Sequence, residues 1–254
     1  MRQNLLEHKM KTKIAKKKTS RLKEKIKNVT VIIVYHTFVA RMKSFGPTAL
    51  IPFKRKKLID KQIEIIEKIF DKSNIIIAAG YGAYEIYKHI EEKYPESNIR
   101  VVENSNFNQS SPSETISLAL NNTNNNNIFI IDGSLILEEN AIRKINFNKN
   151  CTIFYDNNKS LDDAGLNVNE ENKVEHFSFG ASKGWSELIF LKYRRDINQL
   201  RDKLSHPINR KKFVFEILNN MIQFENMKIH GIANSSEMLK INNLYTYKEI
   251  ERKK

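Results

Sequence analysis

The side chains that most often carry chemistry are sparse in this sequence and show no familiar spacing. No two of its histidines lie four residues apart, so their spacing predicts no metal site. The single cysteine, Cys151, begins an apolar stretch, which favours a buried side chain over a nucleophile. The histidines are His8, His36, His89, His176, His206 and His230.

Serine and glycine clusters also lack the context of a known catalytic motif. Ser110, Ser111 and Ser113 are not surrounded by G-x-S-x-G, so loop and helix-cap roles are expected for them. Gly80-Tyr81-Gly82 follows an apolar stretch but is no G-x-G-x-x-G, and we interpret it as a tight turn. Isolated residue types therefore indicate no reaction, and the order of the elements around them carries more information.

The first part of the chain is predicted to alternate between strands and helices. The β-branched run 29–35 is typical of a strand that is buried on both faces. Apolar residues recur at Ile59, Ile63, Ile66 and Phe70, the stripe of an amphipathic helix. Further strands are expected at 73–79, 98–103 and 127–132, and further helices at 84–94, at 113–121 and from about Glu138. This alternation indicates a mostly parallel sheet covered on both faces.

The pattern changes after Asn150. The sequence predicts strands at 151–156, 185–191 and 228–232, a hairpin of 165–168 with 173–177, and helices at 195–204, 210–221 and 247–254. We find no internal repeat and no linker within residues 29–254, so a single body is expected there.

Positive charge is concentrated at the start of the chain. Lys and Arg number 43 against 29 Asp and Glu, a net charge of +14, of which +9 lies in residues 1–28. We predict a basic arm over 1–28, partly helical or disordered. It could bind nucleic-acid phosphates, an acidic protein or an anionic surface, or it could be a solvated leader with no specific partner. The arm has no aromatic residue on which bases could stack.

Composition also limits the cellular context. A single cysteine permits no disulfide within the chain, which favours a reducing compartment. No apolar run approaches the roughly 18–20 residues that span a bilayer. The expected location is therefore the cytoplasm, with a virus particle or another assembly as the alternative.

Several segments, read in order, resemble the nucleotidyltransferase family of the sugar-phosphate and phosphocholine type. The resemblance covers about residues 29–252 and depends on the order and spacing of the segments together. The segments are GPTALIPF (46–53), LIDKQIEII (58–66), VEN (102–104), SETISLAL (113–120), IDGS (131–134), GLNVNEENKVEHF (165–177) and LKINNLYTYKEIER (239–252). The resemblance implies an α/β fold, a Rossmann-like three-layer sandwich with a mixed, mostly parallel sheet of the nucleotide-diphospho-sugar transferase type.

The resemblance also implies roles for particular residues. Arg41 and Asp132 would take part in catalysis, with Arg41 steadying the phosphates and Asp132 as a residual ligand of Mg²⁺; capping the turn after its strand is the alternative role of Asp132. Trp185 and Glu187 would line the acceptor pocket, although Trp185 could equally be a core or rim aromatic residue. The implied nucleotide-binding residues are Arg41, Lys43, Gly80, Tyr81 and Glu114.

The sequence departs from the family at the phosphate loop. Phe38 and Val39 stand where glycines would let the backbone approach phosphate. Thr48 stands in the place of a lysine, for which Lys43 or Lys54 could substitute.

A second departure concerns the metal site. Ser134 and Asn242 occupy positions where the family has aspartates. Because Mg²⁺ favours anionic oxygen ligands, these neutral side chains predict weak or absent metal binding. Replacement ligands could come from Asp156, Asp162 or Asp163.

These observations leave three functions open. The first is a nucleotidyltransferase-like protein with weakened or lost catalysis. By resemblance it would transfer a nucleotidyl group from a nucleoside triphosphate to a sugar phosphate or a similar small phosphorylated acceptor. It would use Mg²⁺ if active and no cofactor otherwise. The second is a non-catalytic structural or docking module in a larger assembly, attached through the basic arm. The third is a nucleic-acid-associated protein.

Overall fold

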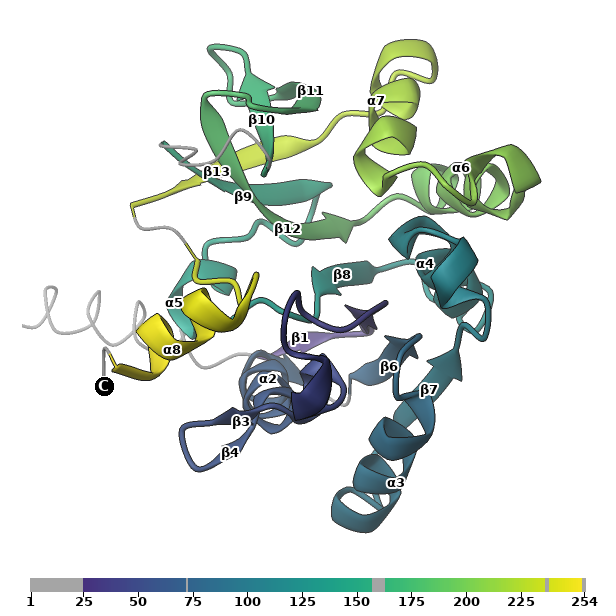
Figure 1. Cartoon of the computed structure of the whole chain (residues 1–254). Helices are drawn as coiled ribbons and strands as arrows, with labels where there is room; N and C mark the ends of the chain where they lie inside the picture. The colour runs from purple at the N-terminus through teal and green to yellow at the C-terminus, as the bar shows by residue number, and fades with distance from the viewer. Residues whose placement is uncertain (1–24, 72, 157–162, 236–237, 253–254) are drawn as a thin grey trace, which may run out of the picture.

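The computed structural model describes residues 25–71, 73–156, 163–235 and 238–252 (Figure 1). Within these residues a mixed sheet of nine strands lies between two layers of helices. The strands of this sheet are β2 (Thr30–Tyr35), β6 (Asn74–Ala79), β7 (Ile99–Glu103), β8 (Ile128–Asp132), β9 (Cys151–Tyr155), β10 (Ala164–Val168), β11 (Val174–Phe179), β12 (Lys183–Leu191) and β13 (His230–Asn234). The predicted α/β three-layer fold is confirmed.

Helices and short elements complete the chain. The helices are α2 (Leu58–Ile69), α3 (Ala83–Lys93), α4 (Pro112–Leu120), α5 (Glu139–Ile142), α6 (Arg194–Ser205), α7 (Val214–Phe224) and α8 (Leu244–Arg252). Two small sheets pair β1 (Ile26–Lys27) with β5 (Phe70–Asp71) and β3 (Pro52–Phe53) with β4 (Lys56–Lys57). Short 3₁₀ turns span Lys43–Phe45, Thr48–Leu50, Phe107–Gln109 and Pro207–Asn209. No helix in these described ranges is long and apolar enough to cross a membrane.

The sheet has a parallel half and a mixed half, in which β13 pairs in parallel with β9 and the other pairs are antiparallel. Strands β7, β6, β2 and β8 lie side by side in parallel, and β12 then pairs antiparallel with β8. The chain runs from β2 outward through β6 to β7 and then returns to place β8 on the other side of β2. The strand order therefore reverses between β2 and β8, which is where open α/β sheets form their ligand clefts.

Alternation along β2 explains why the sandwich has two cores. Val31, Ile33 and Tyr35 belong to the core with α2 and α3, whereas Ile32 and Val34 belong to the core with α4, α6 and α7. Figure 1 shows α4, α6 and α7 gathered on one side of the sheet. All six residues of β2 are buried, as the continuous apolar run predicts for a strand covered on both faces.

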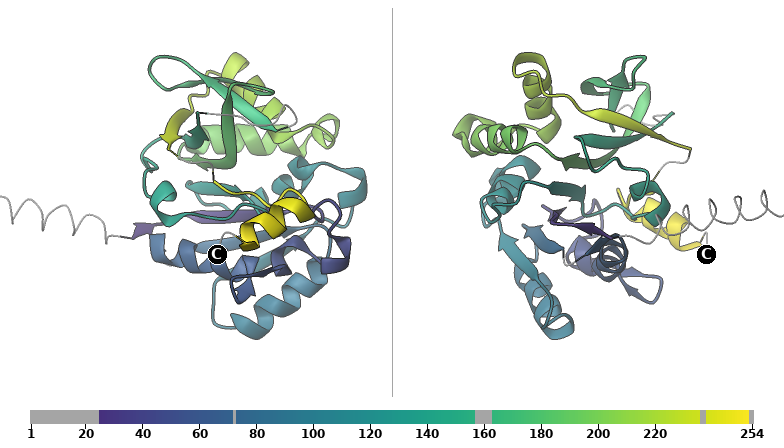
Figure 2. Two further views of the ribbon diagram at one scale, coloured as in Figure 1. Left: turned by 60° about the vertical axis from the view of Figure 1, so that its left-hand side comes forward. Right: turned by 180° about the vertical axis from the view of Figure 1, so that it is seen from behind.

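The C-terminal segment returns to the N-terminal half of the molecule. Figure 2 shows α8, in yellow, lying against the purple and blue half rather than the green half. A small core joins Ile241 and Ile250 to Val39, Met42 and Leu58. The end of the chain is therefore held beside the loop that follows β2.

Some boundaries differ from the prediction. Helix α7 begins at Val214, later than the predicted residue 210, and the hydroxyls of Ser111 and Ser113 donate to the Lys212 carbonyl at 2.6 and 2.7 Å. These bonds hold the segment before α7 outside the helix. The helical stretch expected from Glu138 is only one turn, α5, and α8 begins three residues earlier than predicted.

The predicted basic arm can be followed only at its end. Ile26 and Lys27 pair in parallel with Phe70 and Asp71. Residues 1–24 lie outside the described residues, so the arm and its partners stay predictions.

Candidate functional site

Two adjacent cavities open at the carboxyl ends of β2 and β8, with volumes of about 250 and 320 Å³. They share Val34, Pro112, Asp132 and Lys240, so these residues form the boundary between them. We call the smaller one the loop cavity, because the loop after β2 lines it, and the larger one the aromatic cavity. Their position is the one expected for a ligand cleft in an open α/β sheet.

The loop cavity collects three of the predicted site residues. Asp132, Ser134 and Asn242 line it together with Thr48 and the segment 34–40. Asp132 Oδ1 accepts hydrogen bonds from the Ser134 backbone N–H at 2.8 Å and from the Ser134 hydroxyl. Asp132 therefore caps the turn after β8, as the alternative reading of this residue predicts.

A lysine that the sequence analysis did not identify lies between the two cavities. The Lys240 ammonium is 2.6 Å from Glu187 Oε1 and 3.5 Å from Asp132 Oδ2. Burial opposes the charge of this lysine, but the carboxylates of Asp132 and Glu187 outweigh it and raise the pKa of Lys240 above its usual value. Lys240 is therefore charged throughout the physiological pH range.

Backbone pairing explains why Lys240 lies there. The Ile136 N–H donates to the Leu239 carbonyl at 2.8 Å, and the Ile241 N–H donates to the Ser134 carbonyl at 3.0 Å. The segment that precedes α8 thus runs beside the turn after β8. In the sequence, the one feature that could have pointed to Lys240 is its position two residues before Asn242, a predicted site residue.

Glu187 adopts an unusual backbone conformation for a residue within a strand. Its φ is +54°, and the pairing of β12 with β9 is irregular between Trp185 and Ile189. A left-handed residue other than glycine at a β-bulge is locally strained, and such strain clusters at functional sites. The bulge places the Glu187 carboxylate in the cavity beside Lys240.

The aromatic cavity is mainly apolar. Phe179, Phe213 and Phe215 lie at one side, with ring centroids 5.1 to 5.4 Å apart, and Phe179 and Phe213 are about half exposed. Trp185 also lines it, and its indole N–H donates to Thr152 Oγ1 at 2.7 Å, inside the protein. The charged residues that line this cavity are Asp132, Asp163, Glu187 and Lys240.

The loop cavity is supported by a hydrogen-bond network around His36. His36 Nε2 donates to the Ser110 carbonyl at 3.1 Å, and His36 Nδ1 accepts from the Thr115 hydroxyl at 2.8 Å. The Asn104 side-chain amide in turn donates to Thr115 Oγ1 at 2.8 Å. This arrangement suits a neutral imidazole, and burial lowers the pKa of His36, an effect that its bond to Ser110 partly offsets.

The five predicted nucleotide-binding residues do not line either cavity. Arg41 and Lys43 are exposed, and the Lys43 ammonium lies 5.6 Å from the centre of the Phe38 ring, which does line the loop cavity. Tyr81 packs edge-on against Phe38, with ring centroids 5.1 Å apart. The Glu114 carboxylate lies 3.5 Å from Arg210.

Gly80 has a packing reason for being glycine. A Cβ atom at this position would lie 2.1 Å from the His36 carbonyl oxygen and 2.5 Å from Phe107 Cβ. The absence of a side chain therefore lets the ends of β2 and β6 approach the loop that contains Phe107.

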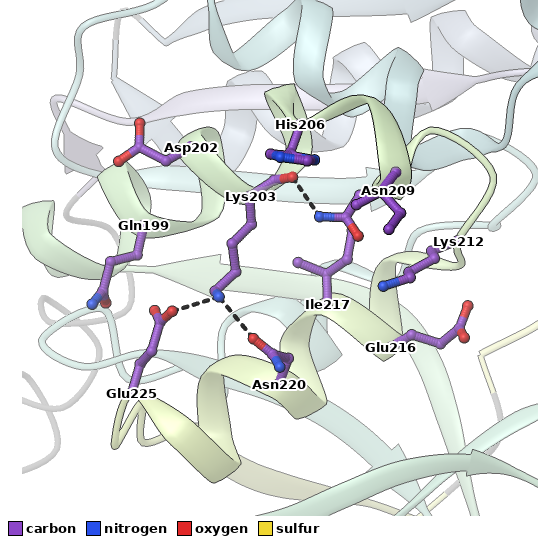
Figure 3. A pocket seen from close by; sticks show the side chains of 11 residues that line it. Gln199, Asp202, Lys203, His206, Asn209, Lys212, Glu216, Ile217, Asn220 and Glu225 are labelled. Atoms are coloured by element: carbon purple, nitrogen blue, oxygen red, sulfur yellow. Dashed lines mark hydrogen bonds and ion pairs between the residues drawn. The ribbon is translucent and has the colours of Figure 1, made fainter.

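A larger cavity, about 720 Å³, lies between α6 and α7 (Figure 3). Lys203 crosses it and contacts Glu225 Oε1 at 2.5 Å and Asn220 Oδ1 at 2.7 Å. None of its lining residues comes from a strand or from the predicted site. It is therefore separate from the cleft at the strand ends.

No protein-family profile matches the sequence, and no curated protein sequence matches it. Solved structures do match. CTP:phosphocholine cytidylyltransferase from Streptococcus pneumoniae is 16% identical, with a TM-score of 0.70 over 89% of this chain and 98% of that one. The inositol-1-phosphate CTP transferase from T. maritima is 9% identical, with a TM-score of 0.70 over 90% and 95%. A nucleoside-diphosphate-sugar pyrophosphorylase from Vibrio cholerae is 11% identical, with a TM-score of 0.69 over 88% and 100%.

The chain has the nucleotidyltransferase fold. Identities of 9 to 16% make this a likeness of fold, and at that level the resemblance predicted from the sequence is confirmed. Other structures with this fold are complexed with CTP or UDP-glucose.

The donors that line the loop cavity do not fit Mg²⁺. Ser134 and Asn242, at the positions where the family resemblance expects aspartates, contribute only neutral oxygens to the loop cavity. The carboxylate that remains there, Asp132, has the Lys240 ammonium 3.5 Å away. Among the described residues, no group of three or more His, Cys, Asp or Glu side chains could hold a metal ion.

The three aspartates considered as replacement ligands have different positions. Asp163 lines the aromatic cavity. Asp156 is exposed and pairs with Lys183 at 3.3 Å, outside both cavities. Asp162 lies outside the described residues.

Proposed function

We propose that this protein binds a nucleotide or a small phosphorylated ligand in the cleft between β2 and β8 and has lost metal-dependent nucleotidyl transfer. The observation that carries the proposal is the composition of the loop cavity. Asp132 is the only carboxylate among the described residues that line it, and Ser134 and Asn242 stand beside it. Nucleotidyl transfer depends on neutralising and orienting a triphosphate, and the single carboxylate of the loop cavity, next to an ammonium group, offers no metal site for this.

The loop after β2 supports the same conclusion. Phe38 lines the cavity and Val39 is buried, so side chains occupy a loop in which the family resemblance expects glycines. The Thr48 hydroxyl, at the place expected for a lysine, donates to the Thr37 carbonyl at 3.3 Å. The loop therefore has neither the glycines nor the lysine with which the family resemblance would hold a triphosphate.

Binding without transfer remains compatible with the cavities. Hydroxyl, amide and carboxylate groups line the loop cavity, and the aromatic cavity beside it offers an apolar surface of ligand-site size. A ligand that lies across the boundary would contact Lys240 from either side. In this proposal the chain orients the ligand and catalyses no bond cleavage.

Isothermal titration calorimetry with CTP, UTP, GTP, ATP and dTTP tests binding, with Mg²⁺ present or with EDTA present. We expect at least one nucleotide to bind with the same affinity in both conditions, and a pyrophosphate-release assay to show no turnover with sugar phosphates or phosphocholine. Pyrophosphate release that EDTA abolishes would overturn the loss of transfer. No binding of these nucleotides, and none of the sugar phosphates or phosphocholine in the same titration, would overturn the ligand assignment.

A pair of variants locates the ligand. Ser134→Leu fills the loop cavity and is expected to abolish binding, whereas Asn220→Leu fills the separate cavity between α6 and α7 and is expected to leave affinity unchanged. Trp185 is the single tryptophan of the chain and lines the aromatic cavity, so its fluorescence reports a ligand there directly. Loss of binding in Asn220→Leu alone would place the ligand elsewhere.

A further inference from the structure

We propose that Lys240 is the resident cation of the cleft, and that its ammonium group takes the electrostatic place of a divalent metal ion between Asp132 and Glu187. The inference rests on the proposed function only in treating this cleft as the ligand site. It adds that metal is excluded by a positive side chain and not only by missing carboxylates.

Geometry is the first support. The two carboxylates that contact the ammonium come from different strands, Asp132 from β8 and Glu187 from β12, and Lys240 comes from the segment before α8. One positive charge thus joins three separate parts of the fold. Divalent ions are bound at protein sites through the same kind of convergent carboxylate oxygens.

Electrostatics is the second support. A metal ion bound to Asp132 would lie roughly 2.0–2.6 Å from a carboxylate oxygen and so within a few ångströms of the Lys240 ammonium. Repulsion between a dication and an ammonium at that separation is strong in a partly buried site. Lys240 retains only 27% of its side-chain exposure, so solvent screens this repulsion incompletely.

The lysine is held firmly rather than resting at the surface. Backbone bonds on either side of Lys240 attach its segment to the turn after β8. Its bond to Glu187 also stabilises the strained bulge of β12. Because Lys240 lines both cavities and an ammonium group has three donors, an N–H group that does not bond Glu187 can reach an acceptor on a bound ligand without any metal.

The test restores the missing carboxylates with and without the lysine. Mn²⁺ binding is measured as the decrease of the electron paramagnetic resonance signal of the free ion. Three proteins are compared: the wild type, the double variant Ser134→Asp/Asn242→Asp, and a triple variant that adds Lys240→Met. We expect no saturable site in the wild type, and we expect the triple variant to bind Mn²⁺ at least about tenfold more tightly than the double variant does. A matched control adds Lys183→Met instead, because Lys183 pairs with the exposed Asp156, and it should behave like the double variant.

Equal Mn²⁺ affinity in the double and triple variants would overturn the inference, and so would a saturable Mn²⁺ site in the wild type. If the triple variant does not fold, the single variants decide: Lys240→Met should gain weak Mn²⁺ binding and Lys240→Arg should not. Nucleotide titrations of the same proteins separate the two proposals. If no nucleotide binds but Mn²⁺ binds as expected in the variants, the proposed function is refuted and the proposed role of Lys240 is still supported.

Discussion

Two clusters of charged side chains in this molecule differ in how fully their carboxylates are enclosed. The helix cluster lies between α2 and α3 around Asp60, and the cleft cluster consists of Asp132, Glu187 and Lys240. Asp60 is 1% exposed, and each of its oxygens accepts two bonds. His89 Nε2 and the Tyr94 hydroxyl donate to Oδ1 at 2.8 and 3.0 Å.

The other oxygen of Asp60 is equally well satisfied. The Lys93 ammonium and the Lys57 backbone N–H donate to Oδ2 at 2.6 and 3.1 Å. Burial opposes the charge of Asp60, but these donors outweigh it and lower the pKa of Asp60 to about 2. Both oxygens of Asp60 are satisfied without any further ligand, as expected for a carboxylate that stabilises the fold.

The cleft cluster is less fully enclosed, although the Ser134 backbone N–H and hydroxyl both donate to Asp132 Oδ1. Asp132 and Glu187 share a single ammonium, each keeps 29% of its side-chain exposure, and Glu187 is strained. Such a group gains most from a further donor. The comparison teaches that a fully enclosed carboxylate stabilises this fold, whereas the partly exposed carboxylates face the ligand cleft.

The largest expected effect is on stability, at the helix cluster. Asp60→Ala leaves four donors without an acceptor and should lower the free energy of unfolding by about 3 kcal/mol. Urea denaturation measures this change. Glu64→Gln on the same helix removes an exposed partner of Lys56 and Lys61 and should cost no more than about 0.5 kcal/mol. Equal losses in the two variants would break the comparison.

The second prediction concerns acid. Because the pKa of Asp60 is lower in the folded protein than its usual 3.8, its stabilising contribution is complete above about pH 4 and is lost as the pH falls toward 2. The loss should reach about 2 kcal/mol. Urea denaturation at several pH values should show the gap between the wild type and Asp60→Ala narrowing toward acid. A gap that does not change with pH contradicts the prediction.

The third prediction tests strain in the cleft. Glu187→Gly and Glu187→Ala both remove the carboxylate, but only glycine adopts a φ of +54° without strain. The glycine variant should therefore be the more stable of the two by about 1 kcal/mol. Thermal or urea denaturation of the pair gives the difference directly. Identical stabilities would show that the bulge relaxes and carries no strain.

The smallest effect is expected at His36, beside the cleft cluster. Burial lowers the pKa of His36 below 6.5, and the bond to Ser110 offsets this only in part. The unfolded chain therefore binds the proton more readily, and stability should fall as the pH drops below 6.5. His36→Gln should reduce this pH dependence, measured by denaturation between neutral and mildly acidic pH. A stability that rises toward acid contradicts the assignment.

Sequence patterns predicted the frame of the molecule well. The β-branched run before Tyr35 predicts a strand buried on both faces, and the stripe from Ile59 to Phe70 predicts the helix that covers it; both are confirmed. The spacing of apolar residues carries this information because the residues that share the buried face of one helix or strand recur at a fixed interval along the chain. The helix boundary at Val214 was predicted too early, because it depends on hydroxyl donors from distant residues, Ser111 and Ser113.

The sequence by itself determined the alternation of strands and helices, the neutral residues Ser134 and Asn242, and the order of segments that identifies the fold. Only the tertiary structure decided that Lys240 meets Asp132 and Glu187, and that Asp60 is enclosed by donors from α3. The reason is physical. Patterns along the chain record which face of an element is buried, whereas the meeting of charges depends on backbone pairing between segments that lie far apart in the sequence.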